Sequence, residues 1–215
     1  MPTAEQLRAN MVAGQLRTNR VADERLVAAL RAIPRETFVP ETRRAFAYID
    51  EDLPLGGGRF LMEPMVFGRL LDEAEVQPRD KVLIVGAGTG YSAAILARVA
   101  GQVVALEQDA ALAATARQQL AALGNVKLVE GALTQGAAAD GPYDLIVIEG
   151  AVDFIPDALV EQLSGNGRLV TVINDHGVGR GVVGRRSGTG FGVMPFMDAQ
   201  VQPLPGFGRP ASFTF

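Results

Sequence analysis

The stretch that decides the fold is residues 82–91, which read VLIVGAGTGY. Its apolar start predicts a buried strand, and its glycines let the backbone turn tightly and approach a ligand. A helix that follows such a turn presents unpaired N–H groups at its beginning. A turn of this kind also occurs where a strand and a helix merely pack closely. The residues expected to hold a ligand here are Gly86, Ala87, Gly88 and Gly90.

An acidic residue follows at a meaningful distance. Glu107 lies 21 residues after Gly86, at the end of the next apolar run. In this place an acidic side chain accepts hydrogen bonds from both hydroxyls of a ribose. The glycine spacing here is G-x-G-x-G, whereas dinucleotide enzymes usually show G-x-G-x-x-G. The pattern favours an adenosyl ligand over NAD.

Apolar runs alternate with helix candidates from residue 81 onward. The expected strands are 82–85, 103–106, 126–129, 145–148 and 169–173, and the expected helices are 92–99, 110–123 and 156–163. Apolar strands separated by helices indicate an α/β fold with a doubly wound, mostly parallel, Rossmann-like sheet. Asp109 is expected to cap the second of these helices and Gly124 to end it. Two short strands near 180–185 and 191–196 predict an antiparallel hairpin at the sheet edge.

The chain before this region reads as a helical section. Thr3 and Gln6 have the spacing of a capping box, and Asp23 can cap a second helix that runs to Arg31. Proline residues then interrupt regular structure. We expect one domain over residues 1–215. Its parts are a helical section with a substrate loop (1–75), a cofactor-binding core (76–174) and a hairpin with a tail (175–215).

Composition argues against several other classes of function. The chain has 20 Lys and Arg against 24 Asp and Glu, a net charge of −4, so no nucleic-acid partner is expected. It has no cysteine and one histidine, His176, which is expected to lie in a turn, so no metal site is expected. The first residues, MPTAEQ, are polar and predict no secretory signal, and no apolar run approaches about 18 residues. We expect a cytoplasmic monomer without membrane contact.

Several segments carry a resemblance to a known family. They read MVAGQLR, DERLVAAL and IPRETFVP at 11–17, 23–30 and 33–40, then DLPL, PDAL and GNGRLV at 52–55, 156–159 and 165–170. Together they resemble the protein-L-isoaspartate O-methyltransferase family, and the first three are absent from unrelated methyltransferases. The resemblance implies S-adenosyl-L-methionine as cofactor and a protein or peptide substrate. The reaction it implies is methylation of isoaspartyl carboxylates in damaged proteins.

The substrate loop departs from the family pattern. The family usually reads GQTISQP, whereas residues 58–64 read GRFLMEP, so Met62 stands where a serine contacts the isoaspartyl group. Ile84 replaces an acidic residue that commonly lies two positions before the glycine turn. Arg59 offers a charge-assisted hydrogen bond to a carboxylate, or it is a solvent-exposed arginine beside apolar anchors. Transfer to an ionised carboxylate needs positioning and desolvation and no base.

Two further family segments are altered near the expected cofactor. A GDGT segment that helps to hold adenine becomes GALT, with Gly131 and Ala132 at its start, and a TAA segment becomes EGA, which begins at Glu149. Glu149 ends the fourth strand at the edge where ligands bind in open α/β sheets. The resemblance places these three residues at the cofactor site.

Three functions stay open at this point. The first is methylation of isoaspartyl residues, and the second is methylation of a different acceptor, which the altered loop favours. The third is a family member that has lost catalysis and acts as a binding module, which the losses at Met62, Ile84 and Ala132 favour.

Overall fold

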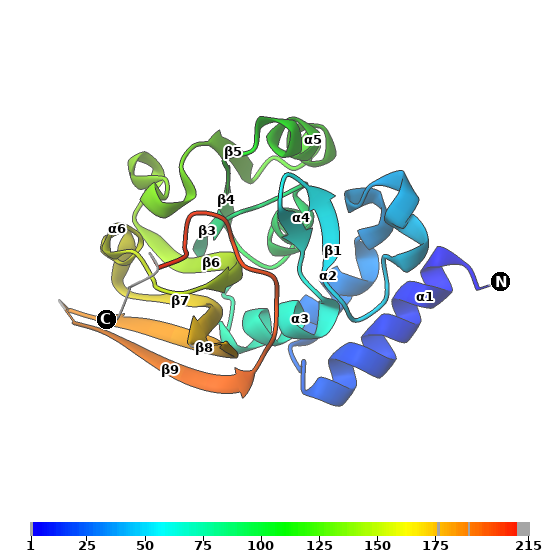
Figure 1. The fold of residues 1–215 in the computed structure, drawn as a ribbon, viewed down its shortest axis with the longest axis horizontal. Coiled ribbons are helices and arrows are strands. Elements are labelled where there is room, and N and C mark those ends of the chain that lie inside the picture. The colour runs from blue at the N-terminus through cyan, green and yellow to red at the C-terminus, as the bar shows by residue number, and fades with distance from the viewer. Residues whose placement is uncertain (1, 176, 189, 210–215) are drawn as a thin grey trace, which may run out of the picture.

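A computed structural model describes residues 2–175, 177–188 and 190–209, and its centre is a seven-stranded sheet flanked by helices on both faces (Figure 1). The strand order is β5-β4-β3-β6-β7-β8-β9. Of the seven strands in this sheet, the five that come first in the sequence run parallel. They are β3 (Lys81–Val85), β4 (Gln102–Glu107), β5 (Val126–Glu130), β6 (Tyr143–Val152) and β7 (Leu163–Asp175). The expected doubly wound, mostly parallel sheet is confirmed.

The antiparallel edge is confirmed as well. β8 (Val178–Ser187) pairs with β7, and β9 (Gly190–Asp198) pairs with β8. His176 lies outside the described residues, so its expected turn stays a prediction.

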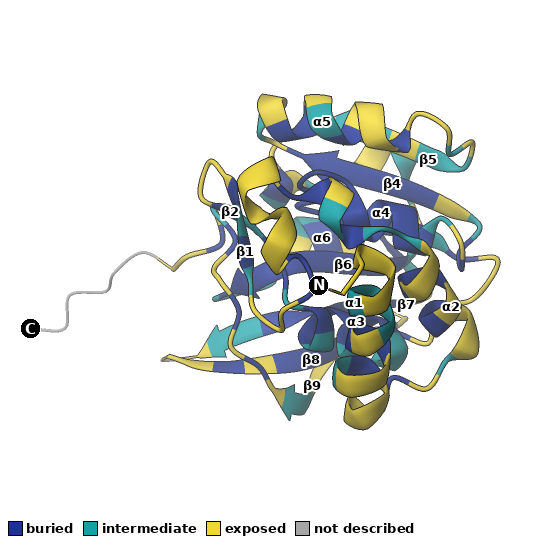
Figure 2. Cartoon of the chain, turned by 90° about the vertical axis from the view of Figure 1, so that its right-hand side faces the viewer, coloured by how far each residue is buried: buried dark blue, intermediate teal, exposed yellow. Residues whose placement is uncertain are grey.

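Alternate residues of the central strands face two separate cores. Val82 and Ile84 pack with the helices that lie within residues 4–32 and 64–120, whereas Leu83 and Val85 pack with the helix of residues 157–161 and with the C-terminal segment, residues 199–209. This double burial explains why the strands read as continuous apolar runs. In Figure 2 the central strands are buried, and α5 (Ala110–Leu120) buries the face that lies on the sheet and exposes the opposite face.

Capping residues set the start of several helices as expected. The helices are α1 (Ala4–Met11), α2 (Glu24–Ala32), α3 (Pro64–Glu73), α4 (Tyr91–Leu96), α5 (Ala110–Leu120) and α6 (Asp157–Glu161). Thr3 and Gln6 form the predicted capping box, and Asp23 and Asp109 cap α2 and α5. The prediction that Gly124 ends α5 is wrong, because the helix ends at Leu120. A turn follows, in which the N–H of Leu123 donates to the carbonyl oxygen of Leu120 at 2.9 Å, and β5 begins three residues later at Val126.

The N-terminal section is not wholly helical. After α1 it continues as a π-helix (Val12–Leu16) and a short 3₁₀ turn, and two more 3₁₀ segments cover Arg35–Phe38 and Glu41–Phe46. It then forms a hairpin of β1 (Leu53–Gly56) and β2 (Arg59–Leu61). These strands are too short to show a period in the sequence.

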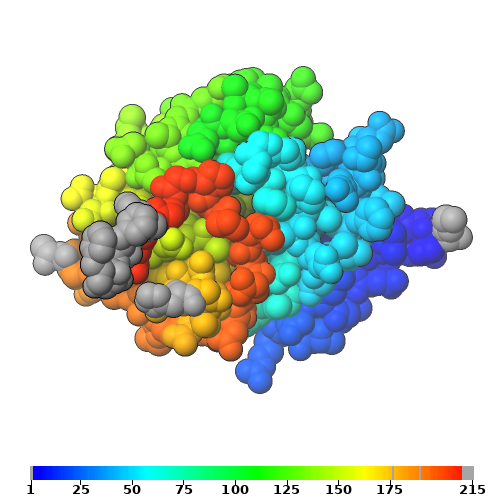
Figure 3. All heavy atoms as spheres, in the orientation of Figure 1, coloured from blue at the N-terminus to red at the C-terminus, as the bar shows by residue number. Residues whose placement is uncertain are grey.

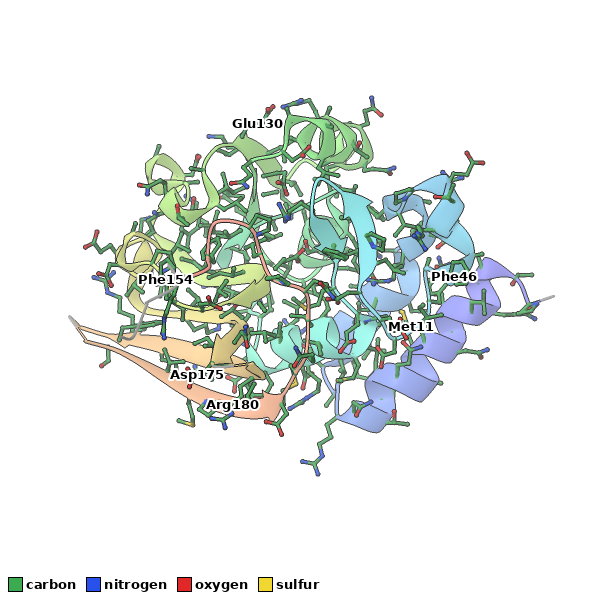
Figure 4. The ribbon with its side chains drawn as sticks, in the orientation of Figure 1. Met11, Phe46, Glu130, Phe154, Asp175 and Arg180 are labelled. Atoms are coloured by element: carbon green, nitrogen blue, oxygen red, sulfur yellow. The ribbon has the colours of Figure 1, made fainter. Side chains whose placement is uncertain are left out.

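The C-terminal segment, residues 199–209, crosses the carboxyl edge of the sheet (Figures 1 and 3). Ala151 at the end of β6 donates its N–H to Gln202 (2.9 Å) and accepts from the N–H of Leu204 (2.8 Å). Phe207 contacts Phe154, which is labelled in Figure 4, with ring centroids 6.3 Å apart. Residues 199–209 are thereby fixed over the edge at which ligands bind in α/β sheets.

No helix among the described residues is long and apolar enough to cross a membrane.

One buried arginine ties β7 to the loop before β3. Arg168 donates to the carbonyl oxygens of Ala74, Glu75 (3.1 Å) and Asp144 (3.0 Å), and it forms an ion pair with Asp80. We expect Arg168→Met to lower the free energy of unfolding by about 3 kcal/mol or more, because Asp80 would stay buried without its cation. Urea unfolding measures the change.

The matched control is Arg185→Met, since Arg185 lies opposite Arg168 in the β7–β8 ladder but is exposed. It should change the free energy of unfolding by no more than about 0.5 kcal/mol. Equal effects of the two substitutions would contradict the assigned role of Arg168.

Candidate functional site

Three residues meet at the carboxyl edge of the sheet because of the strand register. Val85 lies opposite Leu106 on one side and Ile148 on the other. The next residue of each strand is Gly86, Glu107 or Glu149, and these three therefore reach the same level. Elements far apart in the sequence thus build one site.

The glycine turn has the backbone conformation that its composition predicts. Gly86, Gly88 and Gly90 have φ values of 87°, 56° and 98°, which lie in a backbone region that residues other than glycine rarely adopt. The N–H groups of Gly86 and Ala87 donate to the carbonyl oxygen of Leu106, at 2.9 and 3.0 Å. The turn is therefore anchored on β4, and two of its donors are used inside the protein.

Glu107 is the centre of a buried hydrogen-bond network. Its Oε2 accepts from the N–H of Gly88 (2.7 Å), and its Oε1 accepts from the N–H groups of Gln108 (2.9 Å) and Asp109 (3.0 Å). The Arg59 guanidinium completes the set with an ion pair of 2.6 Å to Oε1. Both side chains are buried, at 2% exposure for Arg59 and 0% for Glu107.

Arg59 therefore lies where the sequence analysis did not place it. The alternative of a solvent-exposed arginine is wrong, since the side chain points inward from β2 and also donates to the carbonyl oxygen of Gly86 at 2.7 Å. Its binding to an acceptor carboxylate stays a prediction. In the structure its anionic partner is Glu107, the residue expected to hold a ribose.

Apolar side chains complete the closure of the turn. A methyl group added at Gly86 would lie 3.0 Å from Cδ1 of Leu204, and one at Gly88 would lie 2.9 Å from Cδ1 of Leu55. At the hairpin tip, a methyl group on Gly57 would lie 2.6 Å from Oδ2 of Asp109. The β1–β2 hairpin and the C-terminal segment therefore press on the glycine turn from two directions.

As these side chains stand, they do not fit an adenosyl cofactor. Both oxygens of Glu107 already accept hydrogen bonds, and Arg59 covers Gly86. The adjoining cavity, lined by Arg59, Met62 and Leu204 among others, has a volume of only about 10 Å³. That is about the space of one water molecule. A nucleoside requires a rearrangement of this site.

Glu149 lines the same small cavity and differs from Glu107 in its partners. It is 8% exposed, and its Oε1 has no hydrogen-bond partner among the described residues. Burial raises the pKa of this carboxyl to about 7, although Ser92, Arg59 and Arg35 oppose the shift. The group therefore takes up its proton near neutral pH.

The loop position of the family serine is held by a residue that the sequence analysis missed. Arg35 is fully buried and donates to the carbonyl oxygens of Met62 (2.7 Å) and Ala47 (2.8 Å). Its guanidinium lies 5.0 Å from the ring centre of Tyr91. Met62 is 4% exposed, with its backbone fixed and its side chain in the core. Arg35 stands in the IPRETFVP segment, but nothing in that pattern shows that the arginine points inward.

The two expected adenine-site residues lie beside the strand ends. Gly131 follows β5 and donates its N–H to the carbonyl oxygen of Glu107 at 3.1 Å, and Ala132 is exposed next to it. Their position agrees with an adenine site next to the ribose site, and their role in binding stays a prediction. Leu204 was also missed, because its place over Gly86 depends on the path of the C-terminal segment.

Comparison with known proteins identifies the family. A family model described as protein-L-isoaspartate(D-aspartate) O-methyltransferase matches residues 7–189. The protein-L-isoaspartate O-methyltransferase of Koribacter versatilis is 42% identical over 165 residues, which are 76% of this chain and 74% of that protein. That of Methanoregula boonei is 37% identical over 201 residues, which are 93% of each chain.

Solved structures agree on the fold. A protein-L-isoaspartate O-methyltransferase matches with a TM-score of 0.79 at 24% identity, over 95% of this chain and 66% of that one. A beta-aspartate methyltransferase from Plasmodium falciparum, solved in complex with S-adenosyl-L-homocysteine, matches with a TM-score of 0.77 at 17% identity, over 95% and 99%. Identities this low show the fold alone. The family model and the sequence relatives confirm the resemblance: this chain belongs to the protein-L-isoaspartate O-methyltransferase family.

Proposed function

We propose that this protein is an S-adenosyl-L-methionine-dependent methyltransferase that methylates isoaspartyl carboxylates in damaged proteins or peptides. The observation that carries the proposal is the extent of the family match. It spans residues 7–189, which include the N-terminal segments, the substrate loop and the whole parallel sheet. A shared cofactor fold alone would match only the sheet.

The acceptor requires little chemistry from the protein. A carboxyl group with an ordinary pKa near about 4 is ionised at neutral pH, so no base is needed to activate it. The protein must hold the acceptor in line and keep water away. Phe60 and Met62 supply apolar walls to the cavity beside Glu149, and Arg35 fixes the backbone of Met62.

The cofactor site we propose is the carboxyl edge around the glycine turn. The backbone of Gly86, Ala87, Gly88 and Gly90 would approach the cofactor. Glu107 would accept hydrogen bonds from its ribose. Gly131 and Ala132 lie next to Glu107 and would border the adenine.

Two observations favour a second function. Glu107 is closed by Arg59, and the serine of the family loop is absent, as a binding module without catalysis would allow. Calorimetric titration with S-adenosyl-L-homocysteine together with a methyl-transfer assay separates the two. A chain that shows neither binding nor transfer is a module, whereas a chain that shows both is an enzyme.

The first prediction concerns the acceptor. The protein should transfer a radiolabelled methyl group to an isoaspartyl peptide and not to the matched aspartyl peptide. The reason is that the two peptides present their free carboxylate at different positions relative to the backbone. Cofactor binding without transfer to either peptide would contradict the proposed acceptor.

The second prediction concerns the loop. Met62→Ser should raise kcat/KM for an isoaspartyl peptide by about tenfold, because a hydroxyl that donates to a charged group contributes about 1.5 kcal/mol. Met194→Ser is the control, since Met194 is 68% exposed on β9, and it should leave kcat/KM unchanged. No gain from Met62→Ser would show that the missing serine does not limit turnover.

A further inference from the structure

Two carboxyl groups flank the glycine turn, and they differ in their hydrogen-bond partners. Glu107 at the end of β4 accepts hydrogen bonds from Arg59 and from three backbone N–H groups. Glu149 at the end of β6 is buried, and its Oε1 has no partner among the described residues. A buried, unpartnered carboxyl oxygen costs free energy unless it has a use.

The side chain that can serve both carboxyl groups is Arg59. It extends from β2, and it lines the same small cavity as Glu149. Its positive charge already acts on Glu149 and favours the ionised carboxylate there. The guanidinium presents several donors in one plane and forms bidentate pairs with carboxylates. Arg59 therefore pairs with one of the two acids and lines the cavity beside the other.

Arg35 also favours the ionised form of Glu149, and its Nη1 has no hydrogen-bond partner among the described residues, but a movement of Arg35 would leave Arg59 on Glu107. Two donors of Arg35 are fixed on the carbonyl oxygens of Ala47 and Met62. Among the described residues, Arg59 is the arginine that forms an ion pair with Glu107, so its displacement is what would free that acid.

We infer that Arg59 exchanges its partner when the cofactor binds, leaving Glu107 free for the ribose and pairing with Glu149. Glu149 is then a positioning residue, since it acts on the cofactor through Arg59. The inference rests on the cofactor of the proposed function. It removes one part of the misfit, because it takes the guanidinium away from Gly86 and gives the unpartnered Oε1 of Glu149 a partner.

Two consequences follow for affinity. In the free protein Arg59 competes with the ribose, so only molecules with Arg59 displaced can bind. The apparent Kd rises by the inverse of the fraction of such molecules, and a minor state at about 10% gives about a tenfold penalty. Removing Arg59 should strengthen binding, whereas removing the charge of Glu149 should weaken it.

A proton accompanies the exchange. Burial raises the pKa of Glu149 to about 7 while Arg59 is on Glu107, so below that pH the free protein carries a proton there. Arrival of Arg59 lowers the pKa, and the proton leaves. Cofactor binding should therefore release close to one proton at pH 6 and almost none at pH 8, with affinity rising up to about pH 7. The ionisable and polar groups that face Glu149 or line its cavity are Arg59, Arg35, Tyr91, Ser92, Glu107, Asp52 and Gln202.

The experiment is calorimetric titration of the full chain with S-adenosyl-L-homocysteine in buffers of different ionisation enthalpy at pH 6, 7 and 8. We expect proton release in the wild type as stated. Arg59→Gln should bind at least about tenfold more tightly without proton release. Glu149→Gln should bind more weakly, also without proton release. A merely structural role would weaken binding in both variants.

Glu63→Gln is the matched control, because burial, together with Asp50, Asp52 and Glu51, raises the pKa of Glu63 to about 7 as well. It should keep the wild-type proton release. Thermal unfolding verifies that each variant is folded, and the wild-type proton count tests the inference even if Arg59→Gln does not fold. Absence of proton release in the wild type at pH 6, or weaker binding by folded Arg59→Gln, would overturn it.

The proposed function fails in a different way. The expected proton release and variant affinities without methyl transfer to an isoaspartyl peptide would support the exchange and refute the acceptor. Methyl transfer in a wild type that binds without proton release would support the enzyme and refute the exchange.

Discussion

The buried carboxylate of Glu107 organises the edge of the sheet on which the site is built. An ionised group removed from water costs several kcal/mol unless charges and hydrogen bonds compensate it. Here the compensation comes from three separate parts of the chain: the N–H of Gly88 in the glycine turn, those of Gln108 and Asp109 after β4, and the guanidinium of Arg59 in the hairpin. The position of each part therefore depends on the same charge.

Two segments far apart in the sequence meet over the glycine turn. The hairpin brings Arg59 and Leu55 from before the first parallel strand, and the C-terminal segment brings Leu204 from after the last strand. The segment that carries Leu204 is held by backbone hydrogen bonds to Ala151, beside Glu149. A ligand that enters the turn must therefore displace side chains rather than fill a ready cavity, and the free energy of that displacement reduces its affinity.

Two acidic residues lie where the substrate loop, residues 58–64, meets the sheet. Asp52 and Glu149 line the cavity, and burial raises the pKa of both carboxyl groups. Asp52 has partners, since it accepts from the N–H groups of Glu63 (2.7 Å) and Gln202 (2.6 Å) and so joins the loop to the C-terminal segment. Glu149, in contrast, has an Oε1 without a hydrogen-bond partner among the described residues, so this carboxyl group can gain or lose a proton without breaking a hydrogen bond at that atom. In a low-dielectric site, a carboxyl group that has hydrogen-bond partners is much lower in free energy than one that lacks them.

Most of the scaffold could be predicted from the residues alone. The period of apolar runs gave the parallel strands, and Thr3, Asp23 and Asp109 gave helix starts, because strand burial and helix capping depend on residues close in sequence. The glycines of 86–90 likewise predicted their own turn. The family followed from local segments as well, such as residues 11–17, and the comparisons confirmed it.

The state of the site was decided by tertiary structure. That Arg59 points inward to Glu107, that Arg35 holds the backbone of Met62, and that Leu204 covers Gly86 are contacts across 48, 27 and 118 residues of chain. An arginine in a short hairpin reads the same in sequence whether it faces water or a buried acid. Only the folded chain brings the acid to it, because charge pairing at a distance leaves no local period or spacing to detect.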